Sequence, residues 1–340
     1  MSDIWVRQEG RAGRITLQRP EALNAATYDM LRAIKAAVDG WAEDDSMELV
    51  ILDAEGERAF CSGGDIADLY AAGRAGDFAF GRQFWADEYR LNAKLAEYPK
   101  PIYAFLQGFT MGGGVGLGCH ARHRIVGDTS QIAMPECGIG LVPDVGGSLL
   151  LAQAPGRLGE YLGLTGARMG AGDAIYCGFA DHYAPETDWE ALKASLIATG
   201  ALPDLTDAPA APLAAAQAEL DGFFARETLG DIITALDSTD SPATDPARKA
   251  LLRNSPLSMA AALHVIRRVR AARTIRDALR EEYRFTWRAS EQGDFLEGIR
   301  AAIIDKDRRP KWRHGPMSVT QEDALAMLAP LGENELKLEG

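Results

Sequence analysis

Several features that mark particular classes of protein are absent from this sequence of 340 residues. No uninterrupted apolar run is long enough to span a bilayer, and the first residues contain no apolar signal core. The formal net charge of −13 argues against non-specific binding to nucleic acids or membrane surfaces, because their phosphates attract basic proteins. We therefore expect a soluble, cytoplasmic protein. An anionic small ligand is still compatible, since it needs only a local basic patch.

The sequence also has little of the chemistry that cysteine, serine and metals supply. The cysteines lack the spacing of a metal site, and so long a chain does not depend on a disulfide framework. There is no Gly-x-Ser-x-Gly elbow for a serine nucleophile, and Cys61 and Cys137 have no obvious basic partner. We expect reduced thiols, no metal and no redox cofactor. The four cysteines are Cys61, Cys119, Cys137 and Cys177.

What the sequence does contain is an ordinary globular composition, with 47% hydrophobic and 25% charged residues. Its first part alternates short apolar runs with amphipathic segments, which predicts an α/β fold whose strands are buried and parallel. Residues 201–215 are rich in Pro, Ala and Asp and predict a surface linker. From about residue 214 onward nearly every segment has helical periodicity. We therefore expect a catalytic core over residues 1–200 and a mainly helical region over 214–340.

Two glycine-rich turns follow predicted buried strands. The first is Gly63-Gly64 before Asp65, where a helix is predicted to start, and the second contains six glycines between positions 108 and 118. The second turn lacks the Gly-Lys-Ser/Thr ending of a phosphate-binding Walker loop and does not match the dinucleotide fingerprint. Backbone N–H groups at such turns can point toward a ligand. A plain strand-to-helix turn is the alternative for Gly63-Gly64.

The rest of the chain is organised around one stretch, residues 134–147. It holds two carboxylates, Glu136 and Asp144, eight positions apart among apolar and small residues, each preceded by a proline. Carboxylates in apolar surroundings are costly to bury unless they are paired or used, and shifted pKa values tend to mark functional sites. The alternative for Asp144 is a helix cap in front of the apolar run that begins at Ser148. Glu136 fits no helix start, so the functional interpretation is stronger for it.

These pieces together indicate acyl or enolate chemistry. Backbone N–H groups from two turns can converge on one oxygen, and losing one donor of such an oxyanion hole typically costs roughly 10²–10³ in rate. A carboxylate beside it can act as general base or as nucleophile. The residues alone do not distinguish among the reactions of this class.

Four motifs resemble the enoyl-CoA hydratase/isomerase (crotonase) superfamily in order and spacing over roughly residues 1–190. The resemblance implies a spiral of ββα units with a helical C-terminal extension and a coenzyme A thioester as substrate. It also implies an oxyanion hole formed by the N–H groups of Gly64 and Gly113. The motifs are Ala22-Leu23-Asn24-Ala25, Ala59 to Ile66, Gly112-Gly113-Gly114 and Pro135-Glu136.

Two features favour one branch of this superfamily. Hydratases carry a second catalytic glutamate soon after the triple glycine, and that position here is Gly116. The pair Glu136 and Asp144, the helical extension and the segments 294–301 and 305–312 resemble instead the 3-hydroxyisobutyryl-CoA hydrolases, over nearly the whole chain. This resemblance implies hydrolysis of a short β-hydroxyacyl-CoA thioester, such as 3-hydroxyisobutyryl-CoA in valine breakdown.

In this hypothesis Glu136 activates water or attacks the carbonyl. Asp144 binds the substrate hydroxyl, positions Glu136 or protonates the leaving thiolate. An enoyl-CoA isomerase, or a residual hydratase, is the second hypothesis, because an isomerase can move a proton with one carboxylate. A non-catalytic binder of coenzyme A thioesters is the third, and the intact acid pair argues against it.

The coenzyme A site is expected along the loop at Leu23 and Asn24, with Gly63, Asp65 and Gly112 in the neighbouring turns. Because coenzyme A is polyanionic and the chain is acidic, basic contacts must be local. Arg58 is one candidate. The arginine-rich face at 267–276 is another, although a solvated face is the simpler interpretation. The resemblance also implies a homo-oligomer, a trimer or hexamer, and no nucleic-acid or membrane partner.

Overall fold

A computed structural model describes residues 3–239, 241 and 244–338. The chain divides into two compact units, and each is assembled from three stretches of sequence. No helix in the described part of the chain is long and apolar enough to cross a membrane. Unit 1 contains Met1–Asp65, Leu91–Ala133 and Arg168–Pro212, whereas unit 2 contains Ile66–Arg90, Met134–Ala167 and Leu213–Gly340.

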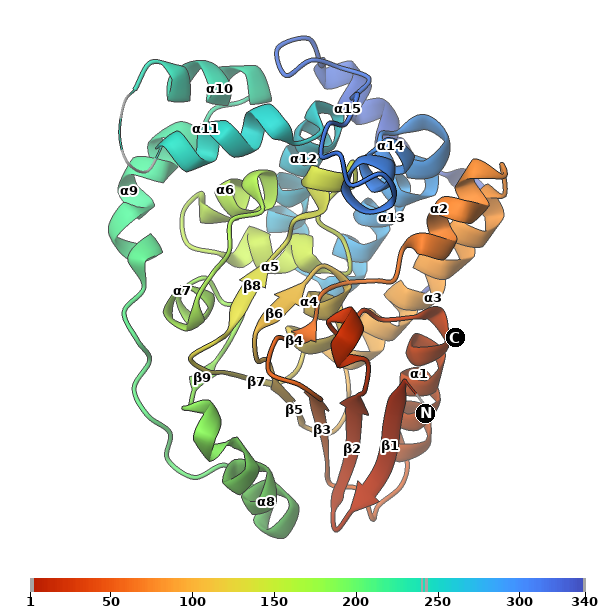
Figure 1. The fold of residues 1–340 in the computed structure, drawn as a ribbon, viewed down its shortest axis with the longest axis vertical. Helices are drawn as coiled ribbons and strands as arrows, with labels where there is room; N and C mark the ends of the chain where they lie inside the picture. Colours follow the sequence, from red (N-terminus) through yellow and green to blue (C-terminus); the bar gives the residue numbers. More distant parts are fainter. Residues whose placement is uncertain (1–2, 240, 242–243, 339–340) are drawn as a thin grey trace. The chain divides into compact units, whose positions relative to one another are not determined.

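Unit 1 contains two sheets (Figure 1). The larger sheet has the order β1-β2-β3-β5-β7-β9, in which β1 and β2 are antiparallel and every later pair is parallel. The smaller, fully parallel sheet has the order β4-β6-β8. The larger sheet is built from β1 (Ile4–Glu9), β2 (Ala12–Leu17), β3 (Leu49–Ala54), β5 (Ile102–Phe105), β7 (His123–Val126) and β9 (His182–Tyr183). The smaller is built from β4 (Ala59–Cys61), β6 (Phe109–Met111) and β8 (Gln131–Ala133).

From β3 onward, successive strands of unit 1 alternate between these two sheets. The pairs β3–β4, β5–β6 and β7–β8 each put their first strand in the larger sheet and their second in the smaller one, and helices follow. This is the spiral of ββα units that the sequence motifs predict. The other elements of unit 1 are η1 (Pro20–Ala22), α1 (Tyr28–Ala42), α4 (Gly113–Gly118), α7 (Ala171–Tyr176), η3 (Glu186–Asp188) and α8 (Trp189–Thr199).

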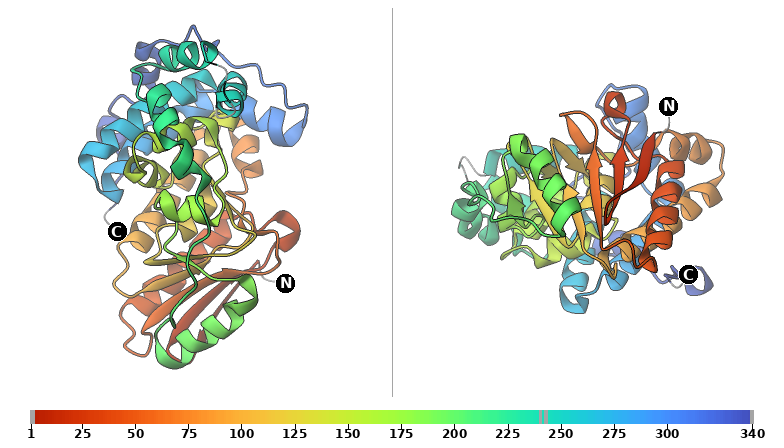
Figure 2. Two further views of the ribbon diagram at one scale, coloured as in Figure 1. Left: turned by 90° about the vertical axis from the view of Figure 1, so that its left-hand side faces the viewer. Right: turned by 90° about the horizontal axis from the view of Figure 1, so that it is seen from below.

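Helices cover both faces of the larger sheet. On one face, Leu49, Phe105 and Ile125 form a buried cluster with Trp189 of α8, and Figures 1 and 2 show α8 lying along the strands. On the other face the ring of Trp41, near the end of α1, occupies the space beside Gly13. Strands covered on both sides must be apolar at consecutive positions, which is why the continuous run at residues 49–52 predicts a buried strand.

Unit 2 is helical in its described part, and α12 lies at its centre. This helix contacts α5, α6, α10, α13 and α15. It begins at Pro256 after Ser255, whose side chain accepts a hydrogen bond from the Ser258 N–H, a strong start signal. The elements are α2 (Ala67–Arg74), α3 (Phe78–Ala96, which ends in unit 1), η2 (Glu136–Ile139), α5 (Gly147–Gln153), α6 (Leu158–Thr165), α9 (Pro212–Phe224), α10 (Leu229–Asp237), α11 (Thr244–Arg253), α12 (Pro256–Ala272), α13 (Ile275–Gln292), α14 (Phe295–Ile299), the π-helical turn η4 (Arg300–Ile304), α15 (Gln321–Met327) and η5 (Gly332–Asn334).

The predicted helix start at Asp65 is wrong. Helix α2 begins at Ala67, and its N-cap residue Ile66 makes no side-chain capping bond. The Asp65 carboxylate is instead held by Arg19, whose Nη1 and Nη2 each lie 3.2 Å from its Oδ2. Asp65 thus forms an ion pair with a residue far away in sequence and lies outside the helix.

Candidate active site

In unit 1 the Leu23-Asn24 loop is attached to the first glycine turn. Leu23 and Asn24 have φ values of 52° and 53°, and the Leu23 carbonyl accepts a bond from the Ser62 N–H at 3.0 Å. The Asn24 side-chain amide is buried and donates to the carbonyls of Glu55 and Ala59 at 2.9 and 2.8 Å. The Asn24 side chain therefore shapes the loop, whereas Leu23 is partly exposed.

The two glycine turns of unit 1 approach each other closely. A Cβ placed on Gly63, which has a φ of 122°, would lie 4.0 Å from the backbone nitrogen of Gly113. A Cβ on Gly114 would lie 2.1 Å from the carbonyl oxygen of Cys61, so only glycine permits this packing. Among the hydrogen bonds of the described residues, none uses the N–H of Gly64 or Gly113. The structure thus brings together the predicted residues Gly63, Gly64, Gly112 and Gly113.

In unit 2, Glu136 is the first residue of the short helix η2. Its side chain is buried, and its Oε2 has no hydrogen-bond partner among the described residues. A buried polar atom without a partner is rare in proteins and requires an explanation, such as a functional role. Burial, and then the charge of Asp144, raises the pKa of Glu136 well above its ordinary value.

The predicted alternative for Asp144, a side-chain cap on the following helix, is wrong. The N-cap residue of α5 is Gly146, which has no capping side chain of its own. The Asp144 carboxylate instead accepts a bond from the Tyr89 hydroxyl at 2.8 Å, and Thr286 Oγ1 lies 3.4 Å from the same hydroxyl oxygen. The turn at residues 144–146 carries the acid into this contact because Val145 and Gly146 both have left-handed backbones.

Four buried carboxyl groups of unit 2 influence one another. Burial raises the pKa of Asp144 to about 7, although the hydrogen bond from Tyr89 has the opposite effect and lowers it. Burial raises the pKa of Glu282 to about 8, with the charge of Asp144 adding to the shift. Burial and then Asp144 raise the pKa of Glu88 well above its ordinary range. Glu136 is the fourth member, and we call these residues the acid cluster.

No ion pair of the described residues includes a member of the acid cluster. Like charges without a cation cannot all ionise in an apolar site, so the cluster retains protons at neutral pH. A site that holds both a protonated carboxyl group and a carboxylate near pH 7 can donate and accept protons in one reaction cycle. The acid cluster thus has the electrostatics of general acid–base catalysis.

The cysteines near these residues are poorly suited to act as nucleophiles. Burial, and then the charge of Glu136, raises the pKa of the Cys137 thiol well above its usual range, which keeps it protonated and weakly nucleophilic. All four cysteines are free and buried. Within the described ranges no group of three or more His, Cys, Asp or Glu side chains has the arrangement of a metal site.

Three members of this environment were missed from sequence: Glu88, Tyr89 and Glu282. The signal that marks the two glutamates is an acid on the apolar face of a helix. Glu88 follows the buried pair Phe84 and Trp85 of α3 at helical spacing. Glu282 follows Ala278 and Leu279 of α13 in the same way. Tyr89 lies next to Glu88 on α3, and its ring is buried.

The arginine-rich face at 267–276 is not simply solvated, as the sequence suggested. Arg270 forms a two-pronged ion pair with the buried Glu160, with Nη–Oε distances of 2.7 and 2.8 Å. Arg267 donates to backbone carbonyls at the end of α9, including that of Glu227 at 2.8 Å. These two guanidinium groups connect parts of unit 2. Arg58, the other candidate for a phosphate contact, is exposed directly before β4 of unit 1.

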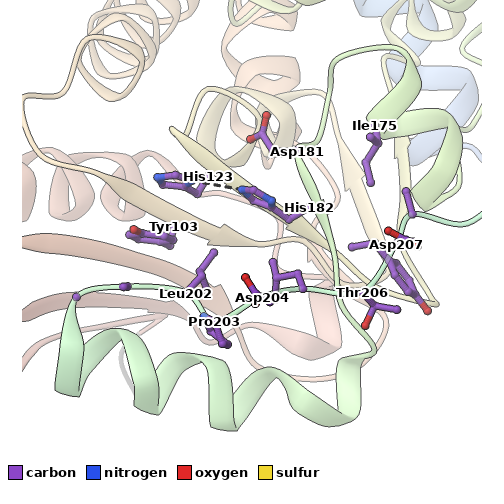
Figure 3. A pocket seen from close by; sticks show the side chains of 15 residues that line it. Tyr103, His123, Ile175, Asp181, His182, Leu202, Pro203, Asp204, Thr206 and Asp207 are labelled. Atoms are coloured by element: carbon purple, nitrogen blue, oxygen red, sulfur yellow. Dashed lines mark hydrogen bonds between the residues drawn. The ribbon is translucent and has the colours of Figure 1, made fainter.

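A separate cavity of about 570 Å³ lies in unit 1 beside β7 and β9 (Figure 3). Tyr103 and His123 stack at its wall with ring centroids 4.4 Å apart, and His123 Nδ1 lies 3.4 Å from His182 Nε2. Burial, and then the neighbouring His182, lowers the pKa of His123. Neither the glycine turns nor the acid cluster contributes to its lining. We assign these rings to packing of the segment 200–208 against the sheet.

The chain has extensive similarity to characterised proteins. The 3-hydroxyisobutyryl-CoA hydrolase of Gallus gallus, described as mitochondrial, is 33% identical, over 99% of this chain and 91% of that protein. The 3-hydroxyisobutyryl-CoA hydrolase 1 of Arabidopsis thaliana is 36% identical, over 92% and 87% respectively. The predicted cytoplasmic location stays a prediction.

Two crystal structures match the fold over almost their entire length. One, described as an enoyl-CoA hydratase from Rhodobacter sphaeroides 2.4.1, is 59% identical with a TM-score of 0.97, covering 99% of this chain and 100% of the other. The second, described as a carnitinyl-CoA dehydratase from Mycobacterium thermoresistibile, is 41% identical with a TM-score of 0.94, covering both chains fully. A family model of enoyl-CoA hydratase/isomerase matches residues 12–328. The chain therefore belongs to the enoyl-CoA hydratase/isomerase family and has the crotonase fold.

Proposed function

We propose that the protein hydrolyses short β-hydroxyacyl-CoA thioesters, with 3-hydroxyisobutyryl-CoA as the substrate to test first. The observation that carries this proposal is a buried pair of acids. Glu136 Oε2 has no hydrogen-bond partner in the part of the chain that the structure describes, and Asp144 accepts a bond from Tyr89. Relatives named 3-hydroxyisobutyryl-CoA hydrolase, 33–36% identical over nearly the whole chain, support the same reaction.

The reaction breaks the C–S bond of the thioester and forms a C–O bond with an oxygen that comes finally from water. Its transition state places negative charge on the thioester oxygen. We assign stabilisation of that charge to the N–H groups of Gly64 and Gly113, which no hydrogen bond among the described residues uses. Backbone donors fixed before the reaction cost no reorganisation when the charge develops, which is why two rigid glycine turns suit this task.

Glu136 and Asp144 supply the proton transfers. In one route ionised Glu136 takes a proton from water as the water attacks the carbonyl. In the other, Glu136 attacks and forms a mixed anhydride, which water then cleaves. In both routes the departing thiolate needs a proton, and a carboxyl group that is protonated at neutral pH supplies it. We assign that donor to Asp144, because burial raises its pKa to about 7 and so keeps part of it protonated near neutral pH.

Single-turnover hydrolysis in ¹⁸O-labelled water tests the covalent route. If Glu136 attacks and water then cleaves the anhydride at the Glu136 carbon, the label appears in the Glu136 carboxyl group and not in the released acid. If water attacks the substrate carbonyl directly, the label appears in the acid and peptide mass spectrometry finds unlabelled Glu136.

The second candidate is enoyl-CoA hydration or isomerisation. The description of the Rhodobacter sphaeroides structure, at 59% identity, favours it. The absence of a side chain at Gly116, inside α4, weighs against hydration, because that reaction needs an acid and a base placed around the double bond.

The test measures two reactions on the purified protein. Thiol release from 3-hydroxyisobutyryl-CoA reports hydrolysis, and loss of enoyl absorbance from crotonyl-CoA reports hydration. We expect fast thiol release and little hydration. Hydration or a double-bond shift without thiol release would overturn the proposal, and tight thioester binding without any turnover would favour a binding protein.

Variants then connect the activity with the site. Glu136→Gln should abolish thiol release while thioester binding, measured by calorimetry, stays nearly intact. Glu43→Gln, at an exposed position after α1, is the matched control and should behave as the wild type. Near-normal turnover in Glu136→Gln would contradict the assignment.

For the coenzyme A moiety we propose contacts at the loop of Leu23 and Asn24, with Arg58 meeting a phosphate. The exposure of Arg58 supports this, since a mobile cation at the surface can follow a flexible anionic ligand. Arg58→Ala should raise KM and leave kcat nearly unchanged. Assembly into a trimer or hexamer stays a prediction from the resemblance, which light scattering can test.

A further inference from the structure

The turn that carries Asp144 has an unfavourable backbone conformation. Val145 has a φ of 52° and Gly146 a φ of 78°, so two consecutive residues lie in the left-handed region. A β-branched residue there is a genuine outlier, because its side chain crowds the backbone. Such strain persists only when surrounding contacts determine the conformation, and it concentrates at functional sites. The contacts that hold this turn therefore matter for the placement of Asp144.

Glu282 of α13 provides those contacts. Its Oε2 accepts a hydrogen bond from the Gly146 N–H at 2.8 Å, and its Oε1 accepts one from the Ser148 N–H at 3.1 Å. The Ser148 hydroxyl donates to Oε1 as well. One fully buried carboxyl group thus binds three donors located immediately after the strained residue Val145.

The same helix reaches Asp144 from a second direction. Thr286 lies one helical turn beyond Glu282, on the same face of α13. Its Oγ1 is 3.4 Å from the Tyr89 hydroxyl, which donates to Asp144. Residues of α13 thus act on both sides of Val145, directly through Glu282 and through Tyr89 on the other side.

We propose that Glu282 is a positioning residue for the acid pair, and that α13 of the C-terminal region fixes the turn from Asp144 to Ser148 in its catalytic conformation. The proposal rests on the proposed role of Glu136 and Asp144 in catalysis. It gives the helical region after residue 214 a specific function, which is to fix the turn that carries Asp144. The short helix α5 has no side-chain cap of its own that could do so.

Glu282 also acts through its charge. The groups facing it are Tyr89 of α3, Glu136 of η2, Asp144 of the turn and Ser148 of α5, and the charge of Glu282 raises the pKa of Glu136. Glu88 of α3 belongs to the same acid cluster through Asp144. Removal of the Glu282 charge should therefore lower the pKa of Glu136, one member of the acid pair. Loosened packing would also lower these pKa values by reducing burial, so the shift is interpreted together with hydrogen exchange at residues 144–150.

The test compares Glu282→Gln with Glu281→Gln, which lies next to it on α13. Glu281 pairs with Arg268 and Arg284 instead of the turn. Glutamine keeps the size of the side chain but turns one acceptor into a donor, so it cannot accept from both backbone N–H groups. We expect Glu282→Gln to lower kcat by about 10- to 100-fold, because small misplacements of reacting groups have effects of this size. KM should change less than about twofold, and the kcat–pH profile should move to lower pH.

A second variant and a second measurement keep the test independent of folding and of activity. Ser148→Ala removes one of the three donors but retains the Glu282 charge, so we expect a smaller loss of kcat than in Glu282→Gln. Hydrogen exchange of a peptide covering residues 144–150 should be faster in Glu282→Gln than in Glu281→Gln. This measurement needs no substrate.

The outcomes separate the two proposals. A wild-type protein that does not release thiol refutes the proposed hydrolysis, while the exchange comparison still decides the role of Glu282. An active wild type with equal kcat, pH profile and exchange in Glu282→Gln and Glu281→Gln overturns the positioning role. A loss of thermal stability in Glu282→Gln without a shift of the pH profile or a change in exchange at 144–150 overturns it as well.

Discussion

The hydroxyl of Tyr89 donates a hydrogen bond of 2.8 Å to Oδ2 of Asp144, and both side chains are buried. This bond lowers the pKa of Asp144 and so opposes the effect of burial, which raises it to about 7. Tyr89 thus sets how much of the acid pair is ionised near neutral pH. This relationship leads to the first prediction.

Tyr89→Phe should move the pH dependence of catalysis to higher pH. Hydrogen bonds to charged groups contribute about 1.5–3 kcal/mol, which corresponds to about one to two pH units on loss of the donor. The kcat–pH profile measures the shift. Tyr283→Phe is the matched control, because Tyr283 packs edge-to-face on Tyr89 but donates to the carbonyl of Arg82 instead. Equal profiles for both variants would contradict a role of Tyr89 in tuning Asp144.

Asp144→Asn should make the protein more stable at alkaline pH while it impairs turnover. The folded-state pKa of Asp144 is raised from 3.8 to about 7, so the folded protein holds this proton more tightly than the unfolded chain does. The wild type therefore loses stability as the pH rises from about 4 to about 7. The variant avoids this loss, because asparagine does not ionise.

Thermal unfolding at two pH values measures this effect. We expect the variant to exceed the wild type by roughly 1–4 kcal/mol at pH 8 and by less at pH 5. Asp45→Asn, at an exposed position, is the control. Its stability should change between pH 5 and pH 8 by the same amount as that of the wild type. A variant that is less stable than the wild type at pH 8 would show that the carboxylate is stabilised by contacts rather than penalised by burial.

Features that are local in sequence were predictable. Strands β3 and β5, the glycine turns and the pair Glu136 and Asp144 all follow from short stretches, because each is built by neighbours along the chain. The spiral of ββα units came from the resemblance, and the alternation of strands between two sheets confirms it.

Contacts between distant segments were not predictable in the same way. Asp144 stands before Val145 and two glycines, which locally favours a helix cap, yet Tyr89 from α3 binds it instead. Glu282 reaches the same turn from 136 positions away. Whether an acid on an apolar helical face is buried depends on what packs against that face, and one helix does not specify this.

Gly114→Ala should damage both folding and activity. The new Cβ would lie 2.1 Å from the carbonyl oxygen of Cys61, and backbone atoms cannot give way as a flexible side chain can. We expect the free energy of unfolding to fall by about 1–3 kcal/mol or more. In the protein that still folds, kcat should fall by about 10²–10³-fold, because the Gly113 N–H is displaced. Gly170→Ala is the control, since nothing lies within 4 Å of its Cβ position. Wild-type stability and turnover in Gly114→Ala would refute the tight packing of α4 on β4.

Arg270→Met tests whether the arginine-rich face is structural or binds phosphate. Arg270 pairs through both Nη atoms with the buried Glu160, and after the opposing effect of burial this bond lowers the pKa of Glu160. We expect a loss of about 1.5–3 kcal/mol at pH 7. Because a depressed carboxyl pKa gives stability that is lost as the pH falls, the difference from the wild type should shrink below about pH 4.

Arg268→Met is the matched control for Arg270→Met. Arg268 is exposed and pairs with Glu281, so its loss should cost no more than about 1 kcal/mol. Chemical denaturation at pH 7 and at about pH 3 measures the stabilities, and steady-state kinetics measures KM for the thioester. A structural role leaves KM unchanged in both variants. A tenfold rise in KM for Arg270→Met with unchanged stability would instead place a phosphate of coenzyme A at this face, because the guanidinium would then act on the ligand and not on Glu160.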